Sequence, residues 1–65
     1  MVIMYTTHCP MCKVLETKLR AKNIEFVEDD NEDTMAIKGI INVPMLEVGE
    51  QLLTFRESLK WVDAQ

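Results

Sequence analysis

The first twelve residues, Met1–Cys12, read MVIMYTTHCPMC and decide the fold. They begin with an apolar run over residues 1–5 that stops at polar residues, as a buried central strand does. Pro10 then opens a segment with helical periodicity, because the missing N–H of proline would have no intrahelical partner at the first helical position. We therefore expect a strand over residues 1–5, a helix over residues 10–22, and Cys9 at the junction.

The rest of the chain alternates between strand and helix patterns. Asn23 is suited to end the first helix in a left-handed turn, and Gly39 closes the second helix. Pro44 interrupts a strand near its start, and Gly49-Glu50 forms a tight turn into the next strand. The expected elements are strands over residues 24–28, 43–48 and 51–54, and helices over residues 32–38 and 55–62.

The element order β-α-β-α-β-β-α predicts an α/β domain. A strand, a helix and a second strand in succession imply a right-handed crossover and a parallel pair of strands. The terminal hairpin adds two antiparallel strands. We expect a four-stranded mixed sheet flanked by helices on both faces, forming a single domain over residues 1–65.

Length and composition limit the class of protein. A chain of 65 residues buries too little surface for a large internal cavity, and its 48% hydrophobic and 28% charged residues are typical of a folded chain. No apolar run approaches the roughly 20 residues that span a bilayer. The start of the chain lacks the basic segment and cleavage site of a signal peptide. Two cysteines are too few for a secreted disulfide scaffold, so we expect the protein in the reducing cytoplasm. We also expect a monomer.

Charge is unevenly distributed along the chain. Residues 1–22 carry four basic side chains and one acidic side chain, whereas residues 25–33 carry six acidic ones. We interpret the acidic run as a solvated loop and helix start. With a formal net charge of −4 and no basic stripe, the protein is not expected to bind nucleic acid.

Cys9 and Cys12 are the only cysteines of the chain. At the start of a helix, a Cys9 thiolate can accept a hydrogen bond from the Cys12 N–H, and the helix dipole favours the negative charge. Cysteines in such settings have pKa values lowered to roughly 3.5–7.5, from about 8.5. We predict that Cys9 is the exposed nucleophile. Cys12, one turn further on the buried side, is predicted to keep its proton longer and to act as the resolving thiol.

Three other uses of this cysteine pair are less favoured. A zinc site needs four ligands, and the chain offers only Cys9, Cys12 and the adjoining His8. An iron–sulfur cluster shared between two copies would require bridging geometry, which Pro10 disfavours. A structural disulfide that closes so short a loop adds little stability. Redox exchange is the favoured interpretation, and we expect no bound metal.

Three parts of the chain resemble the glutaredoxins and the wider thioredoxin-like superfamily. They are the strand end Tyr5-Thr6, the turn Cys9–Cys12 that opens a helix, and the segment Asn42-Val43-Pro44. Gly49 and Leu59 also fall at matching spacings, so the resemblance covers essentially the whole chain. It implies a thioredoxin-like (glutaredoxin) fold and a small dithiol oxidoreductase that reduces disulfides without a bound cofactor.

The resemblance also implies where a substrate binds. The residue that matches Pro44 is a cis-proline beside the active-site turn in that family, in keeping with the loss of a strand donor at proline. The backbone of the preceding residue, here Val43, pairs in strand fashion with a bound thiol peptide. Glu57 is the counterpart of an acid that holds the γ-glutamyl end of glutathione.

Three further side chains beside the motif are candidates for substrate binding. A charged His8 would favour a thiolate at Cys9, although an exposed loop residue is an equal interpretation. Met11, between the cysteines, offers a flexible thioether to varied partners. Tyr5, at the strand end, is interpreted either as core packing or as a hydrogen-bond donor to a substrate.

The chain differs from dithiol glutaredoxins at two places that bear on the partner. Thr6 stands where the family carries a basic residue for a glutathione carboxylate, and Thr54-Phe55 replaces a Gly-Gly pair that lets a ligand approach. The Phe55-Arg56 pair is similar instead to glutaredoxin-like redoxins that thioredoxin reductase reduces. The implied partners are a disulfide-containing protein, such as ribonucleotide reductase, and either glutathione or thioredoxin reductase as reductant.

A binding module is the alternative from a different functional class. Such a thioredoxin-fold domain would dock a protein partner or hold a metal between two copies, and its cysteines would not turn over. A Cys9 pKa near that of free cysteine would favour this alternative.

Overall fold

The computed structural model describes all residues from Met1 to Gln65. Seven elements follow one another along the chain: β1 (Val2–Tyr5), α1 (Pro10–Ala21), β2 (Val27–Asp29), α2 (Glu32–Ile37), β3 (Met45–Val48), β4 (Gln51–Leu53) and α3 (Phe55–Asp63). The four strands form one sheet in the order β2-β1-β3-β4. β1 and β2 are parallel, whereas β3 is antiparallel to both β1 and β4. The predicted α/β domain with a four-stranded mixed sheet is confirmed.

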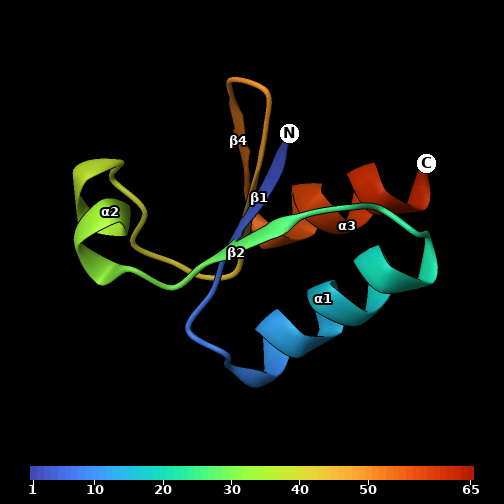
Figure 1. Ribbon diagram of the computed structural model, residues 1–65, viewed down its shortest axis with the longest axis horizontal. Helices are drawn as coiled ribbons and strands as arrows, with labels where there is room; N and C mark the ends of the chain where they lie inside the picture. The colour runs from blue at the N-terminus through green and yellow to red at the C-terminus, as the bar shows by residue number, and fades with distance from the viewer.

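Helices cover both faces of the sheet, as Figure 1 shows, with α1 and α3 side by side on one face and α2 on the other. Successive residues of a strand point to opposite faces, so β1 contributes to both layers. Met4 belongs to the larger core cluster, which it forms with Leu15, Leu19, Leu46 and Val62. Tyr5 belongs to the smaller cluster under α2, with Met35 and Ile40. β1 is therefore a buried central strand, and the turn that follows it starts from a fixed position.

The turn after α1 corrects the predicted start of the second strand. Asn23 has a φ of 56° and ends the helix in the left-handed region, as expected. Its N–H bonds to the Arg20 carbonyl and the N–H of Ile24 bonds to the Leu19 carbonyl, which is the Schellman arrangement. Because the Ile24 N–H is used to close the helix, strand pairing begins only at Val27 and not at residue 24.

The third strand and the remaining helix ends differ from expectation by one or two residues. The Val43–Pro44 peptide bond is cis, as the resemblance implied, and β3 begins after it at Met45 rather than at residue 43. β4 ends at Leu53 because Thr54 caps α3. α2 begins after the N-cap Asn31 and ends at Ile37. None of the three helices combines the length and the apolar character needed to cross a membrane.

Candidate active site

Cys9 is the N-cap of α1. Its backbone is extended, and its Sγ accepts a hydrogen bond from the N–H of Cys12 at 3.2 Å. Pro10 occupies the first helical position, where no N–H is needed. The arrangement predicted for the start of the first helix is confirmed. It places Cys9 partly in solvent, while Cys12 is 1% exposed beneath it.

The two sulfur atoms are in direct contact. Both cysteines are free thiols, and their Sγ atoms lie 2.7 Å apart. The backbone at the start of α1 therefore places the two side chains next to one another, as a disulfide between them would require.

The surroundings of Cys12 favour its ionised form. Burial raises the pKa of the Cys12 thiol. Hydrogen bonds from the Cys9 and Thr6 side chains, and from the backbone of Thr7 and Cys9, outweigh that effect, and the pKa is lowered overall. The expectation that Cys12 keeps its proton longer than Cys9 stays a prediction. The two thiols differ in exposure, since Cys9 is partly exposed and Cys12 is buried.

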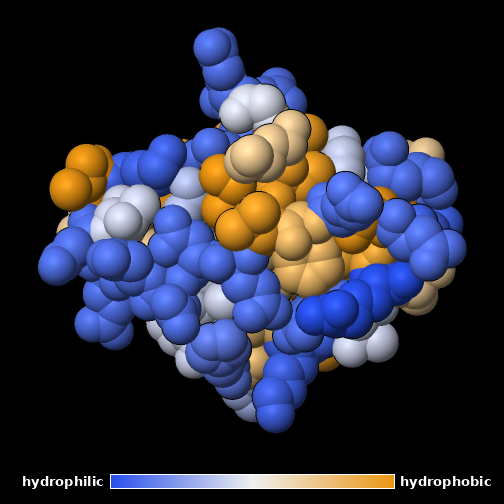
Figure 2. Space-filling model, viewed as in Figure 1, coloured by the Kyte–Doolittle hydropathy of each residue, from blue (hydrophilic) through white to orange (hydrophobic).

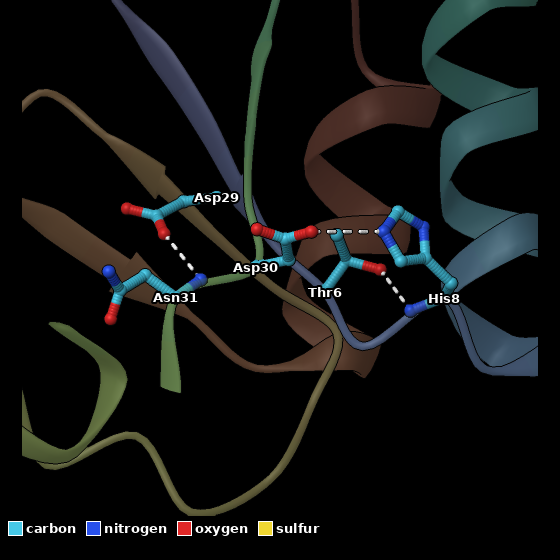
Figure 3. A network of polar contacts seen from close by, with 5 residues as sticks. All are labelled: Thr6, His8, Asp29, Asp30 and Asn31. Carbon is cyan, nitrogen blue, oxygen red and sulfur yellow. Dashed lines mark hydrogen bonds and ion pairs between the residues drawn. The ribbon is translucent and has the colours of Figure 1, made fainter. Parts of the chain in front are cut away.

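The loop between β1 and α1 is fixed by polar contacts, which Figure 3 shows. Thr6 is fully buried, and its hydroxyl oxygen accepts the backbone N–H of His8 at 2.9 Å. His8 has a φ of 62°, and its ring Nε2 lies 3.4 Å from Oδ2 of Asp30. In the next loop, the Asn31 N–H bonds to Oδ1 of Asp29 at 2.9 Å. The segment before Cys9 is thus joined to the loop after β2, and the His8 ring is directed at Asp30.

A groove of about 490 Å³ contains Met11, from the dipeptide between the two cysteines. Nine residues line it: Met11, Gly39, Ile41, Asn42, Val43, Pro44, Met45, Thr54 and Phe55. Five of the nine are hydrophobic. Met11 is 48% exposed and Ile41 is 90% exposed. The structure thus brings three predicted substrate-binding residues, Met11, Val43 and Pro44, into one surface. An extended peptide could be held there by apolar contacts.

Tyr5 does not belong to this surface. Its side chain is 1% exposed, and its hydroxyl donates to Oε1 of Glu47 at 2.9 Å. The Lys38 ammonium donates to the same oxygen at 2.9 Å. Hydrogen bonds from Lys38 and Tyr5 lower the pKa of Glu47. Of the two interpretations of Tyr5, core packing is the one that the structure supports.

Glu57 also has a structural partner. Its Oε1 accepts the Thr54 N–H at 3.0 Å while its own N–H donates to the Thr54 hydroxyl, which makes a capping box at the start of α3. The Thr54 backbone bond lowers the pKa of the Glu57 carboxyl. The sequence Thr54-Phe55-Arg56-Glu57 carries the signature of this motif, a threonine followed three residues later by a glutamate. This signature is visible in the sequence. It indicates that Glu57, which was predicted to bind a ligand, caps a helix.

A second apolar area lies away from the cysteines, in the middle of the face that Figure 2 shows. An open hollow of about 1010 Å³ lies near the chain start and β2, and Val2, Phe26 and Val27 contribute to its lining. The Arg20 guanidinium lies over the Phe26 ring, 5.4 Å from its centre. The hollow contains no cysteine or histidine. The structure also contains no group of three or more histidine, cysteine or acidic residues arranged to hold a metal ion.

Comparison of the chain with protein-family models, with curated proteins and with solved structures gave no match. The chemistry of the cysteine pair and the shape of its surroundings are therefore the basis for inferring a function.

Proposed function

We propose that this protein is a glutaredoxin-like thiol–disulfide oxidoreductase of the thioredoxin-like superfamily, with Cys9 and Cys12 as its redox couple. One observation carries the proposal: two free thiols in contact at the start of α1, one partly exposed and one buried. The element order and the sheet order support it. No bound cofactor is required, because the two sulfurs themselves hold and release the electron pair.

The proposed reaction consists of two exchanges. In the first, the Cys9 thiolate attacks one sulfur of a substrate disulfide, a Cys9–substrate bond forms, and the other substrate sulfur leaves as a thiolate that takes up a proton. In the second, Cys12 attacks Cys9 Sγ, the Cys9–substrate bond breaks, and the second substrate thiolate leaves. The substrate gains two electrons, and the protein is left with a Cys9–Cys12 disulfide that an external reductant must reduce.

A disulfide within a polypeptide is the proposed substrate. The groove at Met11 has a largely hydrophobic lining, which suits apolar residues that flank a substrate cysteine. Of the two groups considered for glutathione, Thr6 is uncharged and buried, and Oε1 of the Glu57 carboxylate is already used to accept the Thr54 N–H. Ribonucleotide reductase is one such protein substrate, and thioredoxin reductase or glutathione is the reductant. A monomer in a reducing cytoplasm fits this activity.

Insulin reduction by the wild type and two variants tests the proposal. Wild-type protein, supplied with dithiothreitol, is expected to accelerate insulin precipitation over dithiothreitol alone. Cys9→Ser should abolish the acceleration, and Cys12→Ser should accumulate a mixed disulfide at Cys9 that mass spectrometry detects. Full activity of the Cys9→Ser variant would contradict the assignment of the nucleophile.

A binding module remains the second candidate, favoured by the 90% exposure of Ile41 and the 48% exposure of Met11 on one groove. Such a module would bind a partner equally well with both cysteines replaced. A double Cys9→Ser, Cys12→Ser variant that still captures an insulin chain as tightly as the wild type would favour the module. An absence of turnover by the wild type would favour it as well.

A further inference from the structure

The loop from α2 to β3 is held by a buried residue at each end. After α2, Gly39 has a φ of 74° and its N–H bonds to the Ala36 carbonyl, while the N–H of Ile40 bonds to the Met35 carbonyl at 2.8 Å. This Schellman arrangement brings the residue after the glycine onto the helix. Ile40 is accordingly buried in the core cluster under α2, and Pro44 is buried at the other end of the loop. The short loop between Ile40 and Pro44 therefore has fixed ends.

Ile41 is the first residue of this loop. Its neighbour Ile40 is turned to the core, whereas Ile41 is left exposed to solvent. Ile41 lines the same groove as Met11, which comes from the turn between the two cysteines. None of the nine lining residues carries a charge. The fold thus presents an uncovered apolar side chain in the groove that contains part of the redox turn.

The backbone of residues 41–43 has polar groups to offer in the same place. These residues lie outside every helix and strand, and none of the backbone–backbone hydrogen bonds outside those elements involves them. Free N–H and C=O groups of this kind can bond to the backbone of an extended polypeptide. A groove that combines them with apolar side chains suits a polypeptide segment better than a small polar disulfide.

We propose that Ile41 is a specificity-determining residue that selects polypeptide disulfides with apolar side chains beside the reacting cysteine. The inference rests on the proposed function, in which Cys9 attacks the substrate disulfide. When such a substrate binds, an apolar side chain next to its cysteine covers Ile41. The complex is then stabilised in proportion to the apolar area removed from water. A disulfide with glycines beside its cysteine lacks this contact.

Two synthetic peptide disulfides test the selectivity. Each is the symmetrical dimer of a short capped peptide, with leucine on both sides of the cysteine in one and glycine in the other. Reduced protein, freed of other reductants, is mixed with each dimer and quenched with a thiol-alkylating reagent. Each reaction converts the two protein thiols to a Cys9–Cys12 disulfide and one dimer to two peptide thiols. Mass spectrometry of the protein over time therefore gives a rate constant for each substrate.

The ratio of the two rate constants, leucine-flanked over glycine-flanked, is the readout. Ile41→Ser should lower this ratio about fivefold, the change expected when roughly half of an isoleucine side chain is buried in the complex. Ile41→Leu keeps an apolar side chain and should retain the wild-type ratio within about twofold.

Ile37→Ser is the matched control. Ile37 is 87% exposed, against 90% for Ile41, and it does not line the groove. Its substitution removes the same amount of apolar surface from the protein and should leave the ratio unchanged. Thermal unfolding of each variant checks that the fold is intact, which we expect because both positions are exposed.

Four results would overturn the proposal: a wild type without preference for the leucine-flanked peptide, an unchanged ratio in Ile41→Ser, a failure of Ile41→Leu to retain the ratio, or an equal fall in Ile37→Ser. A second copy of this chain is the other occupant to test. A wild-type dimer in size-exclusion chromatography that Ile41→Ser dissociates would also overturn the proposal. If the wild type oxidises with neither peptide, the proposed function fails; if it reacts with both and Ile41→Ser leaves the ratio unchanged, only the role of Ile41 fails.

Discussion

The starts of α1 and α3 have the same hydrogen-bond geometry and different chemistry. In each, the N-cap side chain accepts the N–H of the residue three positions on: Cys9 from Cys12 at 3.2 Å, and Thr54 from Glu57 at 3.3 Å. At α3 the third residue returns a carboxylate to the cap N–H. At α1 the third residue is a cysteine whose sulfur lies against the cap sulfur.

This difference explains how a helix cap can place two thiols together for the proposed redox couple. The backbone geometry of a cap places two side chains side by side whatever they are. A threonine and a glutamate in these positions satisfy backbone donors and stabilise the helix. Two cysteines in the same positions leave one cap bond in place and bring two thiols into contact. We expect the start of α3 to contribute to stability and the start of α1 to contribute to activity.

Cys9→Ser should have the largest effect, because it should abolish activity at the start of α1 and leave stability nearly unchanged. Serine is a good N-cap, so the hydroxyl should keep the bond from the Cys12 N–H, and the free energy of unfolding should change by less than about 1 kcal/mol. Exchange with disulfides should be lost entirely, because the remaining thiol is buried. Thermal unfolding and insulin reduction, measured on the same sample, check the predicted stability and the predicted loss of exchange. A large loss of stability would show that the sulfur at this cap is structural.

Thr54→Ala should have the opposite consequence at α3. The substitution removes the hydroxyl that accepts the Glu57 N–H, and this loss is expected to lower the free energy of unfolding by about 1 kcal/mol. For a domain of this size that lowers the melting temperature by roughly 4–8 °C. Circular dichroism during heating measures the shift, with Thr54→Ser as the control that retains a hydroxyl. An unchanged melting temperature in Thr54→Ala would show that the capping box contributes nothing.

Acid should weaken the start of α3 through Glu57. Its pKa is lowered in the folded state by the Thr54 N–H, so its stabilising contribution is fully present above the unfolded pKa of about 4.3 and is lost as pH falls through the lower folded value. Glu57→Gln keeps an oxygen acceptor and removes the charge. The stability difference between wild type and this variant, from urea titrations, should be present at pH 7 and vanish in strong acid. A difference that is constant with pH would contradict this account.

The contact between His8 and Asp30 should have the smallest effect. Both side chains are mostly exposed and the ring nitrogen is 3.4 Å from the carboxylate, so Asp30→Asn should change the unfolding free energy by less than about 0.5 kcal/mol. The His8 backbone N–H and its bond to Thr6 are untouched by this substitution. Urea titration at low and at high salt measures the change, and a loss of more than 1 kcal/mol would show that the ion pair holds the loop.

Local sequence signals predicted the parts of the fold that depend on neighbouring residues. The apolar run before the cysteines, Pro10 at the first helical position and Asn23 at the helix end each act within a few residues, and the structure confirms all three. The start of the second strand was missed because the Ile24 N–H can bond either to a strand or back to Leu19. The pattern of apolar residues does not decide between these partners.

In the candidate site, too, the sequence predicted the positions that depend on local structure. The cap position of Cys9 and the burial of Cys12 follow from helix geometry alone. The roles of Tyr5 and Glu57 were harder to predict. Tyr5 donates to a glutamate 42 positions away, a contact without a local signal, whereas the cap at Glu57 carried a local signal that competed with a ligand interpretation.

A redox titration of the wild type tests the central claim that Cys9 and Cys12 form one two-electron couple. The protein is equilibrated in dithiothreitol buffers of graded ratio, quenched with a thiol-alkylating reagent and analysed by mass spectrometry. We predict two populations only, one with both thiols alkylated and one with a Cys9–Cys12 disulfide, following a two-electron slope of about 30 mV per tenfold change. Cysteines that are modified independently, or that oxidise only between chains, would contradict the account.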